Sequence, residues 1–132
     1  NCVALDARSR LREVPSTILA LVVTKDPYSA GAGLLVEDRL IRGFSGSAGE
    51  LLGTNVNHSL TDVDAACATA VRLVDPEYIA FALPEEVSLS MLTESGQTTR
   101  SRTVRTLDQR TAAVYGATYL AHRYAVEEMI IR

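Results

Sequence analysis

Two cysteines and two histidines are the side chains of this sequence best suited to bind a metal ion or to act as nucleophiles. Cys2 and Cys67 lie far apart and lack a CxxC spacing, and His58 and His122 are also distant from each other. Zinc sites and disulfide frameworks need more such residues at short, recurring spacings. We therefore predict no metal site and no disulfide framework, and we expect Cys67 to be a buried neutral thiol.

Two clusters of three arginines could hold an anion. They are Arg8, Arg10 and Arg12, and Arg100, Arg102 and Arg105. The whole chain carries a net charge of −3, whereas affinity for nucleic acids comes largely from cations that displace counterions from phosphates. We therefore expect both clusters to be solvated surfaces balanced by nearby acidic residues, and we expect no nucleic-acid contact within this segment.

The elements that hold these side chains fit a single domain, because the chain has 132 residues. Apolar residues make up 47% and charged residues 22% of the sequence, which is typical of a globular protein and excludes a disordered or fibrous chain. The longest apolar run, Ile18 to Val23, is far shorter than the roughly 20 residues of a membrane span. We expect a cytoplasmic protein that makes no contact with a membrane.

The first half of the chain alternates turn residues with short apolar runs. Apolar side chains at helical spacing predict a helix within the first eleven residues, ended by Pro15. Three strands in meander order then follow, at 18–24, 30–37 and 39–42, and a glycine-rich irregular connection runs to Gly53.

The second half has the periodicity of crossover helices between strands. The strongest helix prediction spans 60–74, with Ser59 or Thr61 as its N-cap and Asp75-Pro76 at its end. The remaining predicted elements are a buried strand at 78–83, a short helix at 85–93, an edge strand at 98–106 and a long final helix after Asp108. Together the elements predict an α/β fold with a mixed sheet, in which meander strands precede crossover helices.

Several short motifs occur in an order that resembles the ROK family of sugar kinases and sugar-responsive repressors. They are Gly31 to Val36, Asp38 to Gly43, Gly46 to Glu50, Leu73 to Ile79 and Val114 to Ala121. The resemblance implies a ribonuclease-H-like, actin-like ATPase fold, in which residues 1–132 form one domain, the C-terminal lobe of a longer protein. In that family two lobes close over a sugar, and in its repressors a helix-turn-helix segment lies upstream.

The resemblance also identifies candidate sugar-binding residues. In family kinases an Asn-Asp pair begins the helix before the buried strand, and its aspartate is the general base. Asn1 and Cys2 stand at the matching places, so we expect Asn1 to bind a sugar hydroxyl and Cys2 not to catalyse, because a thiol with a pKa of about 8.5 is a poor substitute for a carboxylate. Glu50 matches a sugar-binding glutamate, and it is either a sugar-hydroxyl acceptor or an exposed loop carboxylate.

Two further family features are missing from the sequence. Lys25 to Ser29 replaces a Gly-Thr-Gly phosphate turn, and there Pro27 lacks an amide donor while Asp26 adds a repelling charge. The zinc-binding loop that follows the Glu50 motif in the family is also absent, and His58 is expected to be an exposed loop histidine and not a replacement ligand. These departures predict that the chain binds neither ATP nor any other cofactor.

We therefore expect a regulatory and dimerisation domain of a ROK-type transcriptional regulator that binds a sugar effector and is not an enzyme. The alternative is a fragment of an ATP-dependent sugar kinase. The expected partners are a second copy of the chain, for which the tyrosines of the final helix supply aromatic area, and DNA only through a segment outside this sequence.

Overall fold

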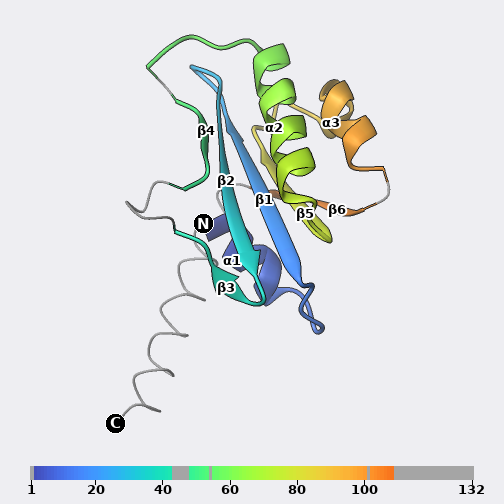
Figure 1. The fold of residues 1–132 in the computed structure, drawn as a ribbon. Coiled ribbons are helices and arrows are strands. Elements are labelled where there is room, and N and C mark those ends of the chain that lie inside the picture. The colour runs from blue at the N-terminus through green and yellow to red at the C-terminus, as the bar shows by residue number, and fades with distance from the viewer. Residues whose placement is uncertain (1, 43–47, 54, 101, 109–132) are drawn as a thin grey trace.

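The computed structural model describes residues 2–42, 48–53, 55–100 and 102–108, and in this part of the chain six strands form one mixed sheet (Figure 1). The helical elements are α1 (Cys2–Ser9), α2 (Leu60–Val74), the 3-10 turn η1 (Leu89–Met91) and α3 (Thr93–Thr98). The strands are β1 (Thr17–Thr24), β2 (Ser29–Val36), β3 (Arg39–Leu40), β4 (Glu50–Leu52), β5 (Tyr78–Leu83) and β6 (Thr103–Asp108). The predicted mixed α/β architecture is confirmed.

The strands follow the predicted sequence of a meander and then crossovers. The sheet order is β3-β2-β1-β5-β6, with β1 antiparallel to β2 and parallel to β5, and β5 parallel to β6. The other edge of β2 is shared by two short antiparallel strands: β3 pairs near Val36, and β4 pairs near Ala30. This second pairing brings β4 close to the β1–β2 hairpin.

The central strand β1 separates two apolar clusters. Ile18 and Ala20 pack toward α1 on one face, while Leu19 and Leu21 pack toward α2 on the other, and all four are at most 1% exposed. Successive residues of a strand point to opposite faces, so the uninterrupted apolar run of β1 indicates a strand covered on both sides. Figure 1 shows α1 on one side of the sheet and α2 with α3 on the other.

The helix α2 has the bounds that the sequence predicts, and its ends explain why. The Ser59 hydroxyl accepts a hydrogen bond from the Asp62 N–H at 3.2 Å, and the Asp62 carboxylate accepts one from the Ser59 N–H at 2.9 Å. This reciprocal pair is a capping box, which satisfies amide donors that the first turn of a helix leaves free. At the other end Asp75 adopts a left-handed conformation with φ 51° before Pro76, and the helix stops there.

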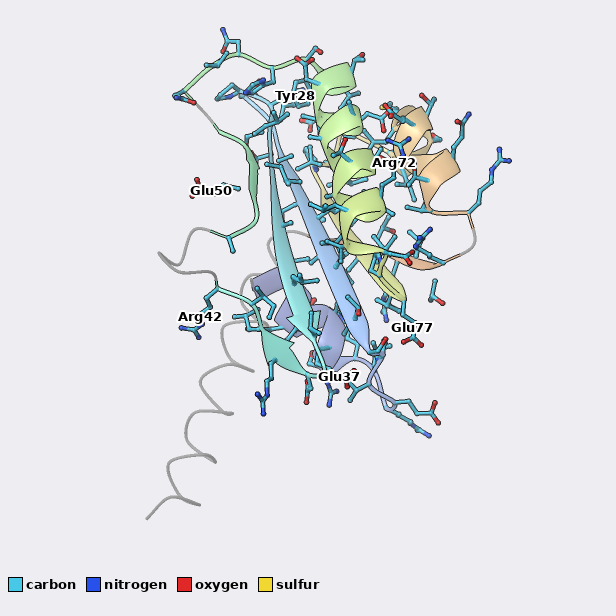
Figure 2. The ribbon with its side chains drawn as sticks, viewed as in Figure 1. Tyr28, Glu37, Arg42, Glu50, Arg72 and Glu77 are labelled. Carbon is cyan, nitrogen blue, oxygen red and sulfur yellow. The ribbon has the colours of Figure 1, made fainter. Side chains whose placement is uncertain are left out.

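One end of the sheet is held by contacts between segments far apart in the sequence. The Glu77 carboxylate accepts a hydrogen bond from the Ser16 N–H at 2.8 Å, which joins the starts of β1 and β5. The Arg8 guanidinium lies 2.8 Å from the Asp38 carboxylate, which joins the end of α1 to the β2–β3 turn. In Figure 2 Glu77 lies at this end of the strands and Tyr28 at the opposite end.

The prediction of a helix at 85–93 is wrong. The chain instead forms the 3-10 turn η1 and then α3 over Thr93–Thr98. The reason is a contact from outside the segment. The Asp64 carboxylate accepts hydrogen bonds from the N–H groups of Glu94 at 2.9 Å and Ser95 at 2.8 Å. A carboxylate at these first amides stabilises a helix that begins at Thr93.

The remaining differences involve short or late elements. The sequence predicts an irregular connection up to Gly53, but its last residues form β4 on the edge of β2. The strand predicted at 98–106 begins at Thr103, because α3 occupies the chain as far as Thr98. The predicted final helix lies outside the described residues.

Candidate functional site

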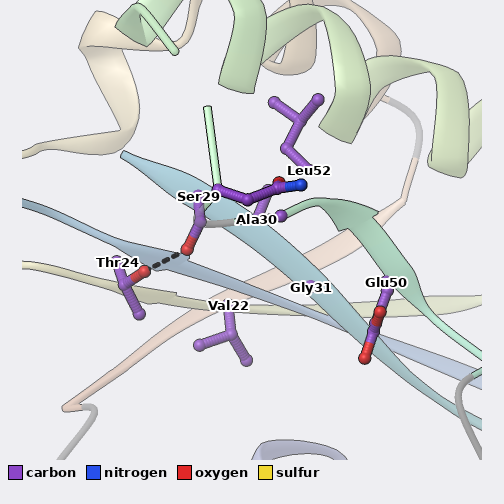
Figure 3. Close-up of a pocket in the computed structure, with 9 residues that line it drawn as sticks. Val22, Thr24, Ser29, Ala30, Gly31, Glu50 and Leu52 are labelled. Atoms are coloured by element: carbon purple, nitrogen blue, oxygen red, sulfur yellow. Dashed lines mark hydrogen bonds between the residues drawn. The ribbon is translucent and has the colours of Figure 1, made fainter. Parts of the chain in front are cut away.

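A pocket of about 560 Å³ lies at the hairpin end of β1 and β2, beside β4 (Figure 3). Its polar lining comes from Thr24, Ser29, Glu50 and Asn55. Its apolar lining includes Val22 at the end of β1. The pocket therefore combines hydroxyl, amide and carboxylate groups with apolar surface, the combination of groups that orients a small polar ligand.

Strand register brings the lining residues together. Gly31 pairs with Val22 on one side and with Glu50 on the other, so the three residues stand in a row across β1, β2 and β4. Residues directly opposite each other on antiparallel strands point to the same face of the sheet. Thr24 and Ser29 pair in the same way, and their hydroxyl groups are hydrogen-bonded to each other.

The pocket lies on the face of the sheet that α1 covers, because Val22 packs against the same apolar cluster as Ile18 and α1. The Arg8–Asp38 contact fixes the C-terminal end of α1 near the start of β1. The N-terminal end of α1 therefore points toward the end of β1 at which the pocket lies. The predicted sugar-binding residue Asn1 immediately precedes this helix but lies outside the described residues.

Glu50 is the sequence-predicted site residue that the structure places in the pocket. Its side chain is exposed, and within the described residues no group donates a hydrogen bond to its carboxylate. An ionised carboxylate has two oxygens that accept hydrogen bonds. The Glu50 carboxylate is therefore available to accept hydrogen bonds from the hydroxyl groups of a ligand.

The hairpin tip that follows Thr24 contributes to the surroundings of the pocket. Lys25 places its ammonium nitrogen 3.9 Å from the Glu86 carboxylate, and Tyr28 forms a backbone bridge with His58. The expectation of an exposed His58 is therefore corrected, since this residue is partly covered and tied to the hairpin. His58 is not part of the pocket lining.

Cys67 matches the expectation of a buried thiol. It is 0% exposed within the apolar cluster beneath α2. Burial, and to a smaller extent the charge of Asp64, raises the pKa of the Cys67 thiol to about 12. Since the thiolate is the reactive form, this thiol is inert at neutral pH. In the described part of the chain no three His, Cys, Asp or Glu residues form a group that could hold a metal ion.

Sequence reasoning missed three polar residues of the pocket. Thr24 and Ser29 flank the hairpin tip symmetrically, and the register of a β-hairpin would have paired them. Asn55 lies in the connection between β4 and α2 and carries no periodic or motif signal. Its place depends on the pairing of β4 with β2.

None of the helices in the described part of the chain has both the length and the apolar character needed to cross a membrane.

Comparison with known proteins identifies the class of fold. No family model matches the chain, and no curated protein matches it. Several solved structures share its fold, and two of them are described here. One is a ROK family protein from Streptococcus pneumoniae TIGR4 in complex with sucrose, with a TM-score of 0.63, 14% identity and coverage of 94% of this chain. The other is Lmo2764, a putative N-acetylmannosamine kinase from Listeria monocytogenes, with a TM-score of 0.64, 14% identity and coverage of 93%.

The resemblance to the ROK family is thus confirmed at the level of the fold. In both comparisons the match covers 64% of the neighbour's own chain. The expectation that the chain is not an enzyme is contradicted by these neighbours, because they include a putative N-acetylmannosamine kinase. That expectation relied on Cys2, on the altered hairpin and on the missing zinc-binding loop, three local changes that leave the shared fold intact.

Proposed function

We propose that residues 1–132 form the sugar-binding, C-terminal lobe of a ROK-type protein with an actin-like arrangement of two lobes. Glu50 accepts hydrogen bonds from sugar hydroxyl groups in this proposal, and Asn1 is a second ligand-binding residue at the start of α1. The sheet order and the mixed strand directions support the lobe assignment. The ROK family fold of the two neighbours supports it independently.

The observation that carries the proposal is the exposed carboxylate of Glu50 at the rim of the pocket, which has no donor among the described residues. A sugar presents hydroxyl donors around its ring and apolar C–H groups on its faces. Glu50 and Asn55 offer acceptors for the hydroxyl groups, and Val22 and Leu52 offer apolar surface for the ring. One neighbour is in complex with sucrose and the other is a putative N-acetylmannosamine kinase, so a sugar is the ligand class to test first.

Titration of the isotope-labelled chain, followed by NMR, tests the proposal. The sugars are glucose, N-acetylglucosamine, N-acetylmannosamine and sucrose. We expect saturable shifts of the backbone amides of Gly31, Glu50 and Asn55, because these residues line the pocket. Mannitol is a control with a comparable number of hydroxyl groups but no ring. Shifts that are absent for every sugar, or equal for mannitol and the ring sugars, would refute the proposal.

A second form of the proposal, a sugar-responsive regulator, is favoured by the hairpin tip. The tip carries the Asp26 carboxylate, and Pro27 has no N–H to donate to a phosphate. In this form the sugar is an effector and a second copy of the chain is a partner. Titration with ATP in the presence of the bound sugar separates the two forms. Saturable shifts near Lys25 would support the kinase form, and their absence would support the effector form.

Self-association is a separate test of the regulator. Light scattering coupled to size exclusion should give the mass of a dimer, while a monomer at high concentration would count against this form. The residues first expected to mediate the contact belong to the final helix, outside the described part of the chain.

A further inference from the structure

The strand β4 that carries Glu50 is only three residues long, so its own backbone hydrogen bonds alone do not hold it on the sheet. It pairs with β2 through Ala30↔Leu52 and Gly31↔Glu50, and the register shifts between these two pairs. A short edge strand with an irregular ladder has few backbone hydrogen bonds of its own. Contacts just before and within β4 must therefore hold it on the sheet.

Gly49, which directly precedes β4, makes such a contact. Its carbonyl oxygen accepts a hydrogen bond from the Ala32 N–H at 2.7 Å. Its φ is +101°, and a Cβ at this residue would lie 2.1 Å from the Ala32 carbonyl oxygen and 3.0 Å from the Ala32 carbonyl carbon. Any side chain here would collide with backbone unless the two strands move apart, and the backbone conformation is one that favours glycine. The close approach of the two strands thus requires glycine.

Leu51 holds β4 from the opposite face of the sheet. Its side chain packs against the apolar cluster of α2 and, with Gly49 and Leu19, lines a hollow of about 190 Å³ behind the strand. Glu50, by contrast, lies directly opposite Gly31, which pairs with Val22 on the other side. Residues opposite each other on antiparallel strands point to the same face, so Glu50 leaves β4 on the pocket side.

We propose that Gly49 is a positioning residue for Glu50. The absence of a side chain at residue 49 lets the backbone close onto Ala32, and this contact fixes the direction in which the Glu50 carboxylate leaves β4. The inference depends on the proposed role of Glu50 in sugar binding. It adds that the orientation of the carboxylate is set by backbone contact at the preceding residue, since no described side chain holds the carboxylate itself.

The first measurement does not require a sugar. Gly49→Ala should raise the hydrogen-exchange rate of the Ala32 amide at least about tenfold, because the new Cβ forces the hydrogen-bonded strands apart. Gly96→Ala is the matched control, because a Cβ there meets no atom within 4 Å. It should leave Ala32 exchange unchanged. Unchanged exchange at Ala32 in Gly49→Ala would overturn the inference.

The second measurement separates positioning from a purely structural role. Gly49→Ala and Glu50→Gln should each weaken sugar binding about tenfold or more, and the double variant should be no weaker than Glu50→Gln alone. Such non-additivity shows that two residues act through one interaction. Additive losses would overturn the inference, because Gly49 would then affect binding without acting through Glu50.

A third variant covers the case in which Gly49→Ala does not fold. Leu51→Ala loosens β4 from its other face without introducing a collision. It should give the same faster Ala32 exchange and the same non-additivity with Glu50→Gln, and a normal Ala32 amide in this variant would count against the inference. If the unmodified chain binds none of the sugars, the proposed function fails, while the exchange rates still decide whether Gly49 fixes β4.

Discussion

Asp64 and Glu50 carry the same functional group in two regions of the molecule that use it differently. Asp64 lies where α2 meets α3, is 7% exposed, and accepts hydrogen bonds from two backbone N–H groups of α3. Glu50 lies on the rim of the pocket, exposed, without a donor among the described residues. A carboxylate bound to backbone amides stabilises the fold, whereas one left without donors is available to a ligand.

The largest expected effect comes from removing the buried carboxylate. Asp64→Ala leaves two N–H groups of α3 without their acceptor, and hydrogen bonds to a charged group contribute about 1.5–3 kcal/mol each. We expect the free energy of unfolding in urea to fall by about 3 kcal/mol. Sugar affinity should not change under conditions in which the variant is folded. A decrease in the free energy of unfolding of less than about 1 kcal/mol would show that the Asp64 carboxylate does not stabilise the fold.

The second variant tests the other half of the comparison. Glu50→Gln keeps the shape of the side chain but removes its charge, so we expect sugar affinity to fall about 10- to 100-fold, as measured by titration. Its free energy of unfolding should stay within about 0.5 kcal/mol of the unmodified chain. Glu13→Gln, an exposed change between α1 and β1, is the control and should alter neither quantity. A destabilised Glu50→Gln with normal affinity would reverse the assignment of the two carboxylates.

The capping box of α2, in which Ser59 and the Asp62 carboxylate bind each other's backbone N–H groups, is expected to contribute less to stability than Asp64 does. Ser59→Ala removes the hydroxyl that accepts the Asp62 N–H, and loss of an N-cap costs about 1 kcal/mol. Urea unfolding monitored by circular dichroism should show this loss. Thr69→Ala, on the exposed side of the same helix, should be close to neutral. Equal stability of the Ser59→Ala variant and the unmodified chain would contradict a structural role for the box.

The smallest effect concerns pH. The hydrogen bonds from the backbone and the side chain of Ser59 lower the pKa of Asp62 below 3.8. The folded state therefore binds this proton less readily than the unfolded state does, so the contribution to stability is present above pH 3.8 and is lost as pH falls through the lowered pKa. In Asp62→Asn the free energy of unfolding should fall less steeply than in the unmodified chain as the pH is lowered below about 4. An unchanged slope would show that the capping box contributes no pH dependence.

How far the sequence predicts this molecule depends on whether a feature is local. The helix α2 is predicted with its bounds because Ser59, Asp62 and Pro76 define both ends within the segment itself. The strand β1 is predicted because its apolar run is uninterrupted. By contrast, α3 is misplaced because its first amides are held by Asp64, which lies 30 residues away from Glu94. Long-range contacts of this kind leave no periodic signal.

The candidate site follows the same rule. Glu50 is predicted through a short motif, although its strand β4 is not, because three residues are too few to show a period of two. These three residues form a strand because they pair with the Ser29 end of β2. Asn55 reaches the pocket only as a result of that pairing, so no feature of its own neighbourhood could have identified it.

The contact between Ser16 and Glu77 has a consequence for the order in which the sheet assembles. It ties together two residues separated by 61 along the chain, at the start of the parallel β1–β5 pair. The hairpin of β1 and β2 closes across only a few residues, and the entropy lost on closing a loop grows with its length. During synthesis the hairpin can form before β5 has left the ribosome. The parallel β1–β5 pair closes the longer loop, so its formation costs more chain entropy than the hairpin does.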